Sequence, residues 1–161
     1  MNRLQKGMVF FALVVLAAAY GFDAAAQAGP YQFYALTPCR VVDTRPTAPA
    51  AQQQGGIVTA GGDRFFTFQT KCGVPAGAKA VTVNLTVVGP TQGGFVSLFP
   101  AGPRPVPMIS TINFATLEPA IANGAIVPLA AATPDLGLVY GSLAGVWTTH
   151  VILDVTGYFA P

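Results

Sequence analysis

The sequence AVTVNLTVV, residues 80–88, shows the clearest alternation of apolar and polar side chains in the chain. In an extended strand, alternate side chains point to opposite faces. The apolar face carries Val81, Val83, Leu85 and Val87. The opposite, wetter face carries Thr82, Asn84 and Thr86. This pattern predicts a strand with one side against a core.

The rest of the chain has the composition of a β protein. After residue 28 it contains one glutamate and two lysines, and no window keeps a helical period. Short runs rich in Val, Ile, Phe and Thr recur between Gly, Pro and Asp instead, which is the spacing expected of a sandwich or barrel. We expect strands at residues 32–36, 40–44, 64–69, 80–88, 94–100, 109–115, 122–129, 136–140 and 147–155.

These strands predict an all-β fold, a single-domain antiparallel β-sandwich. The order is left open between jelly-roll-like and immunoglobulin-like, and a small β-barrel is the alternative. Two segments, GGFVSLFP (93–100) and GAIVPLA (124–130), are apolar on both faces. Such strands need a covering layer, which is a second sheet, a loop or another subunit. Residues 45–63 are rich in Gly, Gln, Pro and Ala and predict a long surface loop.

The first 28 residues have the features of a cleaved signal peptide. Arg3 and Lys6 precede an apolar run at residues 8–22, and an A-x-A cleavage site follows at residues 26–28. The run gives a helix of about 22 Å, shorter than the roughly 30 Å hydrocarbon core of a membrane. We therefore expect a secreted protein, extracellular or at the cell surface, whose β-sandwich domain spans residues 29–161.

Charge and cysteine content narrow the function classes. Six basic and five acidic side chains follow residue 28, without the clusters that phosphate binding needs. We expect no nucleic-acid partner, and no membrane partner after signal cleavage. In an oxidising compartment, Cys39 and Cys72 predict a disulfide. Because His150 is the only histidine, the usual Cys/His zinc sets cannot be assembled, and we expect no metal or cofactor.

The segment TPCRVVDTR, residues 37–45, concentrates charge in a weakly charged chain. Asp43 and Arg45 share a face of an extended segment, which favours a structural ion pair over a ligand clamp. Asp154 lies inside an apolar strand, where a carboxylate usually accepts hydrogen bonds from backbone or arginine; Arg40 and Arg45 are available. A catalytic pair of Asp154 with Asp43 is the weaker alternative. No nucleophile elbow or phosphate loop occurs, so we do not expect an enzyme.

The segment GPYQFYAL, residues 29–36, predicts an extended aromatic arm. We call residues 29–36 the N-terminal arm. One interpretation is an ordinary edge strand of the same domain. The other is a strand donated to a neighbouring subunit, where ladder hydrogen bonds give affinity and aromatic side chains fill pockets. The residues expected to act in assembly are Tyr31, Phe33, Tyr34 and Leu36.

Five motifs in order resemble an uncharacterised secreted bacterial all-β module, which is frequently joined to larger surface or repeat-containing proteins. They are FYALTPCRVVDTR (33–45), CGVPAGAKAVTVNLTVV (72–88), STINF (110–114), ANGAIVPL (122–129) and THVILDVTGYF (149–159). The most distinctive parts are PCRVVDTR, CGVP and DVTGYF. The resemblance implies an exported all-β module with Cys39 paired to Cys72, and it brings no catalytic residues.

Two function classes follow from these features. The first is a secreted structural or surface protein that self-associates into a homo-oligomer or polymer, such as a filament or pilus-like subunit, through the N-terminal arm. The alternative is an extracellular module that binds carbohydrate, such as a surface polysaccharide, or another protein. Its ligand patch would need exposed aromatic rings in one plane, and the candidates are Tyr140, Trp147 and Tyr158.

Overall fold

The predicted strand at residues 80–88 is β4, which lies between two other strands of one sheet. Its side chains alternate between half-buried and buried along their whole length, as predicted. The strands of this first sheet, in order, are β1 (Gln32–Asp43), β9 (Thr148–Ala160), β4 (Ala80–Val88) and β7 (Ala120–Pro128). A short strand, β2 (Val58–Thr59), also pairs with β9.

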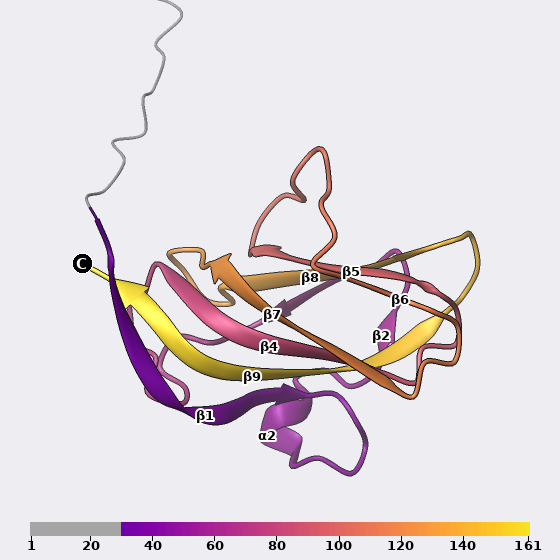
Figure 1. Cartoon of the computed structure of the whole chain (residues 1–161), viewed down its shortest axis with the longest axis horizontal. Helices are drawn as coiled ribbons and strands as arrows, with labels where there is room; N and C mark the ends of the chain where they lie inside the picture. Colours follow the sequence, from indigo (N-terminus) through magenta and orange to yellow (C-terminus); the bar gives the residue numbers. More distant parts are fainter. Residues whose placement is uncertain (1–29) are drawn as a thin grey trace, which may run out of the picture. The chain divides into compact units, whose positions relative to one another are not determined.

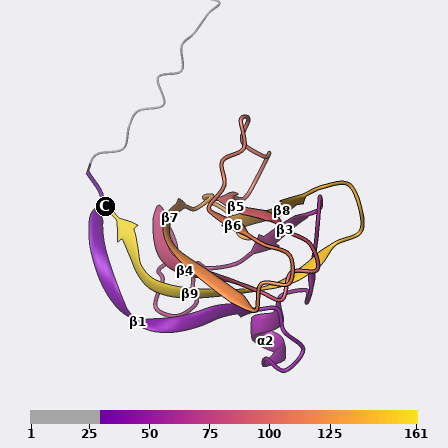
Figure 2. The ribbon, with the colours of Figure 1, turned by 45° about the vertical axis from the view of Figure 1, so that its right-hand side comes forward.

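The second sheet forms the other layer of the sandwich. Its strands, in order, are β3 (Asp63–Phe66), β8 (Leu136–Ser142), β5 (Gly94–Pro100) and β6 (Ile112–Phe114). All pairings in both sheets are antiparallel. Figure 1 shows β1, β9, β4 and β7 in one layer and β5 and β8 in the other, and Figure 2 shows the same two layers from a second side.

The structure, a computed structural model, describes residues 30–161, of which 31–161 form one compact unit. The predicted signal peptide, residues 1–28, lies outside the described residues, as does Gly29 of the N-terminal arm. Within the described range, no helix has the length and apolar character needed to cross a membrane.

The strand order is that of a jelly roll. With β2 left aside and the other strands numbered in chain order, the sheets read 1-8-3-6 and 2-7-4-5. The first strand pairs with the last, and each later strand pairs with its counterpart from the other end, so the chain is one long hairpin rolled up. The predicted all-β sandwich is confirmed. Of the orders left open, the immunoglobulin-like one and the small barrel are not formed.

The hydrophobic core fills the space between the two sheets. Val81, Val83, Leu85 and Val87 all point into it, as the alternation predicts. Its largest fully buried side chains are Tyr140, Phe66, Phe68, Leu85, Leu136, Leu138 and Leu153. Both sheets contribute to this set, so the sheets stabilise each other through one shared core.

Some predicted boundaries are wrong. The strands expected at residues 32–36 and 40–44 are a single strand, β1, with irregular pairing in between. The loop expected at residues 45–63 contains a one-turn helix, α2 (Ala50–Gln53), and β2. The last strand continues to Ala160, because β9 pairs with β1 on one side and β4 on the other. In the sequence, Gly157 interrupts the apolar pattern of this strand. In the structure, the ring of Phe33 lies over Gly157.

The two segments that are apolar on both faces differ in their cover. On the outer face of the second sheet, Phe95 lies over Gly141 and Phe99 over Gly137; a Cβ on either glycine would come within 2.5 Å of the ring above it. Ser97, Phe99 and Val139 on this face are themselves buried, and Arg104 and Met108 of the β5–β6 connection line a pocket with Phe95 and Val139. Over most of β7, residues 30–161 provide no covering layer, so a sheet or loop from this part of the chain does not serve as the cover, and another subunit stays a prediction.

Candidate functional site: the charged cluster and the N-terminal arm

Four charged side chains from both ends of the domain meet on the outer face of the first sheet, and we call them the charged cluster: Arg40, Asp43, Arg45 and Asp154. Asp43 ends β1, and only 4% of its side chain is exposed. Arg45 donates to it from Nε (2.9 Å), Nη2 (2.6 Å) and the backbone N–H (3.2 Å). The sequence places these two residues on one face, and the structure joins them.

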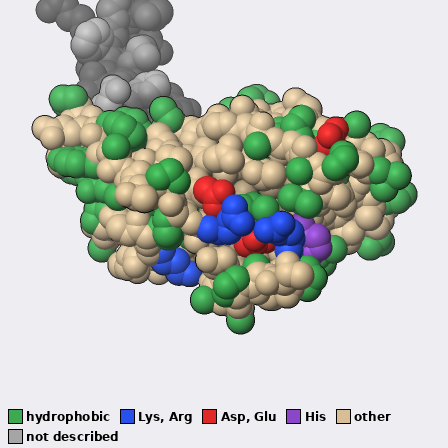
Figure 3. Space-filling view, turned by 60° about the horizontal axis from the view of Figure 1, so that its bottom comes forward, with side chains coloured by type: hydrophobic (Ala, Val, Ile, Leu, Met, Phe, Trp, Pro, Cys, Tyr) green, Lys and Arg blue, Asp and Glu red, His purple; other side chains and the backbone are tan. Residues whose placement is uncertain are grey.

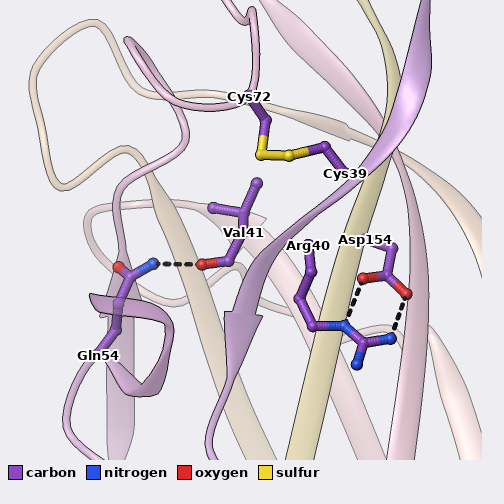
Figure 4. The surroundings of a disulfide bond; sticks show 6 residues. All are labelled: Cys39, Arg40, Val41, Gln54, Cys72 and Asp154. Carbon is purple, nitrogen blue, oxygen red and sulfur yellow. Dashed lines mark hydrogen bonds and ion pairs between the residues drawn. A yellow bond between two sulfur atoms is a disulfide. The ribbon is translucent and has the colours of Figure 1, made fainter. Parts of the chain in front are cut away.

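Arg40 connects the two carboxylates of the charged cluster. Its Nε and Nη2 donate to Asp154 at 2.8 and 3.1 Å, and its Nη1 donates to Asp43 at 3.4 Å. The fork to Asp154 crosses from β1 to β9, where these two residues are direct register partners (Figure 4). Figure 3 shows the charged side chains gathered near the centre of a face with few other charges. The cluster pairs two arginines with two aspartates, so its formal charges balance.

The charged cluster predicts a pH dependence of stability. The hydrogen bonds from the Arg45 side chain hold the pKa of Asp43 below its ordinary value, against the opposing effect of burial. A carboxyl with a lowered folded-state pKa stabilises the fold above its unfolded pKa of about 3.9, and this stabilisation is lost as pH falls through the folded pKa. We expect Asp43→Asn to lower the free energy of unfolding by about 1–2 kcal/mol at pH 7.

The difference between Asp43→Asn and the wild type should begin to shrink below about pH 4, where the unfolded wild type takes up a proton at Asp43. It should disappear below the lowered folded-state pKa of Asp43, where the folded wild type is also uncharged at this position. Urea unfolding at a series of pH values measures it. A difference that stays constant down to pH 2 would contradict the role given to the Asp43 carboxylate.

The disulfide lies next to the charged cluster. Cys39 and Cys72 are bonded, which confirms the predicted pairing and ties β1 to the connection between β3 and β4. Beside it, Gln54 donates from Nε2 to the Val41 carbonyl (3.0 Å), and its Oε1 accepts from the Thr67 N–H (3.1 Å) (Figure 4). The Gln54 side chain thus hydrogen-bonds a backbone carbonyl at the sheet edge formed by β1. Sequence reasoning missed this residue because it lies in a loop without an apolar period.

Asp135 is a second residue that sequence reasoning missed. It is fully buried, and its carboxylate accepts the backbone N–H groups of Phe68 and Gln69, each at 2.8 Å. Its own N–H donates to the carbonyl of Phe66 at 3.0 Å. These bonds fix the chain where it leaves β3, next to the start of β8. The signal available in the sequence is a lone aspartate between Pro134 and an apolar strand, which fits turn residues in general.

The aromatic ligand patch predicted at Tyr140, Trp147 and Tyr158 is wrong. Tyr140 is completely buried in the core, and burial raises its pKa. Trp147 and Tyr158 are each partly buried against the core, close to opposite ends of β9. Eleven residues separate them along the chain, about 37 Å in an extended strand. The three rings therefore do not form one exposed plane.

The N-terminal arm pairs with the C-terminal end of β9 in the same chain. Residues 32–35 lie opposite 160–157 in unbroken antiparallel register. The Tyr34 ring stacks on Tyr158 with centroids 5.0 Å apart, and the Phe33 ring is 5.3 Å from that of Phe159. Figures 1 and 2 show the two strand ends curving away side by side. The arm has thus the position of an edge strand.

Exposed apolar surface remains along the N-terminal arm. Phe33 is 52% exposed, and Tyr31 and Tyr34 are each 37% exposed. Leu36 is more buried and packs against the core beside Gly73. The arm residues predicted from the sequence therefore divide into three exposed aromatic side chains and one anchor.

A bulge separates residues 32–35, the paired part of the N-terminal arm, from the rest of β1. Ala35 lies opposite Gly157 and Cys39 opposite Val155, so residues 36–38 face Thr156 alone. Cys39, immediately after the bulge, is fixed by the disulfide. The covalent anchor therefore holds β1 from residue 39 onward, while the arm lies beyond an irregular segment that contains Pro38.

No protein-family model, curated protein or solved structure matches this chain. The resemblance to a secreted bacterial module therefore stays a prediction. Among residues 30–161, no three His, Cys, Asp or Glu side chains are grouped so that they could hold a metal ion.

Proposed function

We propose that this chain is a secreted structural protein of the bacterial surface that self-associates through its N-terminal arm. One observation carries the proposal: the arm forms its own short ladder with β9, beyond the bulge at residues 36–38. Secretion rests on the signal-like sequence of residues 1–28 and agrees with the disulfide.

The proposed mechanism is exchange of the N-terminal arm between copies. An arm that leaves its own β9 exposes the edge at residues 157–160, and the arm of a second copy restores the same register there. The hydrogen bonds and ring stacking that break within one copy form again between copies, so exchange costs little free energy. The donor and acceptor surfaces differ, so successive exchange links copies head to tail, whereas reciprocal exchange closes a dimer.

The surface around the N-terminal arm suits association of like copies. Phe33 and Tyr34 present apolar area at the edge of a sheet, where proteins that stay monomeric usually place charge. Six basic and five acidic side chains in residues 29–161 give almost no net charge, so copies do not repel each other strongly.

Removing residues 31–35 should abolish this assembly and leave a folded core. The core residues and the disulfide lie outside the deleted segment, so the far-ultraviolet spectrum should be retained. Sedimentation velocity of the oxidised protein, expressed with its leader and purified after export, measures the species present. The full chain should form oligomers or longer polymers, and the truncated chain should sediment as a monomer or at most a dimer.

The matched control is Val106→Ser/Ile109→Ser, which removes apolar surface from the exposed connection between β5 and β6. This variant should assemble like the wild type. The proposal fails if the truncated chain assembles as the full chain does, or if the full chain stays monomeric at every concentration.

A further inference from the structure

The first sheet has an open edge at β7. Its strand order ends there, and within residues 30–161 no strand pairs with the second edge of β7. The pairing with β4 is in unbroken register over nine residues, from Ala80 opposite Pro128 to Val88 opposite Ala120. One edge of β7 is therefore fully used. No strand of residues 30–161 pairs with the other, and Asn123 in the middle of β7 donates from its side-chain Nδ2 to the Thr111 carbonyl (2.7 Å).

The register shows which backbone groups point to the open edge. The Leu129 N–H donates to the Lys79 carbonyl at 2.9 Å, so Leu129 faces β4, and alternate residues of an antiparallel strand face the same side. Residues 121, 123, 125 and 127 also face β4, and residues 120, 122, 124, 126 and 128 face outward. Pro128, which has no N–H to donate, falls in the outward set, as expected for proline at a strand edge.

The other sheet edges offer less to a partner. At β1, Gln54 occupies the Val41 carbonyl. At the edges of the second sheet, β3 and β6 are only four and three residues long. β7 has nine residues and no charged side chain, and its middle residues, Ala122, Asn123 and Gly124, are exposed. Long, uncharged edges are those that pair with another strand.

We propose that β7 pairs with β7 of a second copy, antiparallel, about a two-fold axis at Asn123. In this register Ala120 lies opposite Ile126 of the second copy, and Ala122 lies opposite its Gly124. All four residues point their N–H and C=O groups outward, so each finds a partner, and Pro128 falls outside the paired region. Shifting the axis by one residue brings Pro128 into the ladder without a donor or shortens the ladder.

The side chains of β7 fit the same register. Ile126 is 64% exposed, and in the pair it covers Ala120 of the second copy. Small residues face each other at the centre, where a Cβ on Gly124 would meet nothing within 4 Å.

The proposed β7 pairing deepens the proposed function. It rests on that function for one point, the identification of the partner as a second copy of this chain. A two-fold contact by itself gives only a closed dimer, and polymers need a second, different contact. Exchange of the N-terminal arm and pairing of β7 use separate strands of the first sheet, so one copy can make both. Together they would build an extended array from one kind of subunit.

Cross-linking through Asn123→Cys tests the register. Directly opposed residues of a non-hydrogen-bonded pair have Cα atoms about 4.5 Å apart, close enough for a disulfide. We expect a covalent dimer on non-reducing gels after mild oxidation of the full exported chain. The matched control is Ile126→Cys on the same strand, whose sulfur lies about 20 Å from its counterpart in this register. Its dimer should form at least about tenfold more slowly.

Equal cross-linking rates for the two variants would overturn the proposed register, as would no dimer from Asn123→Cys. Mass spectrometry should show the Cys39–Cys72 bond intact in both variants. Gly124→Pro removes an outward N–H without touching the ladder to β4, and it should lower the average mass measured by sedimentation.

The outcomes separate the two contacts. If the wild type assembles and Gly124→Pro assembles equally, the β7 contact is wrong while the proposed function stands. If deletion of residues 31–35 leaves assemblies as large as those of the wild type, arm exchange is wrong, and the β7 contact stands if these assemblies still cross-link through Asn123→Cys. A wild-type chain that is monomeric at every concentration overturns both.

Discussion

Asp135→Ala will lower the free energy of unfolding by about 3–5 kcal/mol, because it leaves two buried backbone N–H groups without an acceptor. The Asp135 carboxylate binds the N–H groups of Phe68 and Gln69, and the side chain is fully buried. Alanine provides neither an acceptor nor room for bulk water. Urea unfolding followed by tryptophan fluorescence, with Trp147 as the probe, measures the change.

Two variants control for this loss. Asp135→Asn keeps the shape and one acceptor oxygen, so its stability should lie between that of alanine and the wild type. Asp63→Ala breaks an ion pair with Arg104 at a surface where both side chains are about one-third exposed, and it should cost less than about 1 kcal/mol. A result for Asp135→Ala no larger than for Asp63→Ala would contradict the assigned role.

Removing the disulfide will have the second largest effect. Cys39→Ala/Cys72→Ala should lower the free energy of unfolding by about 3–4 kcal/mol, the chain-entropy value for a bridge that spans 33 positions. The bridge acts mainly by limiting the conformations of the unfolded chain, so the double variant should keep the native fold at low temperature. Its melting temperature should fall.

Reduction of the wild type provides the matched comparison. The reduced wild type and the double alanine variant should melt at similar temperatures, both below the oxidised wild type. An unchanged melting temperature after verified reduction would show that the bridge does not stabilise the fold.

Much of the fold could be predicted from local pattern. The alternation at residues 80–88 identifies a strand whose two faces meet different surroundings, and β4 has this arrangement. The pairing of Cys39 with Cys72 could be predicted from the presence of two cysteines together with the predicted export. Strand order could not be derived, because it depends on contacts between segments far apart in sequence, such as β1 with β9.

The missed features depend on position within the jelly roll. Tyr140 was expected at the surface, but its strand lies inside the second sheet and its ring points into the core. Asp135 was not identified, because its role depends on N–H groups more than 60 residues earlier in the chain. The apolar sequence of β7 predicted a cover, and only the structure shows that residues 30–161 do not provide one over most of the strand.

Exchange of the N-terminal arm is the central claim, and a double-cysteine variant tests it most directly. Tyr34 and Tyr158 are register partners with rings 5.0 Å apart, so Tyr34→Cys/Tyr158→Cys should form a disulfide wherever the arm is bound. On a denaturing, non-reducing gel, exchanged arms predict a ladder of covalently linked copies that collapses to one band on reduction. If the oxidised variant runs entirely as an internally cross-linked monomer under conditions in which the wild type assembles, the arm stays in its own chain and the account is wrong.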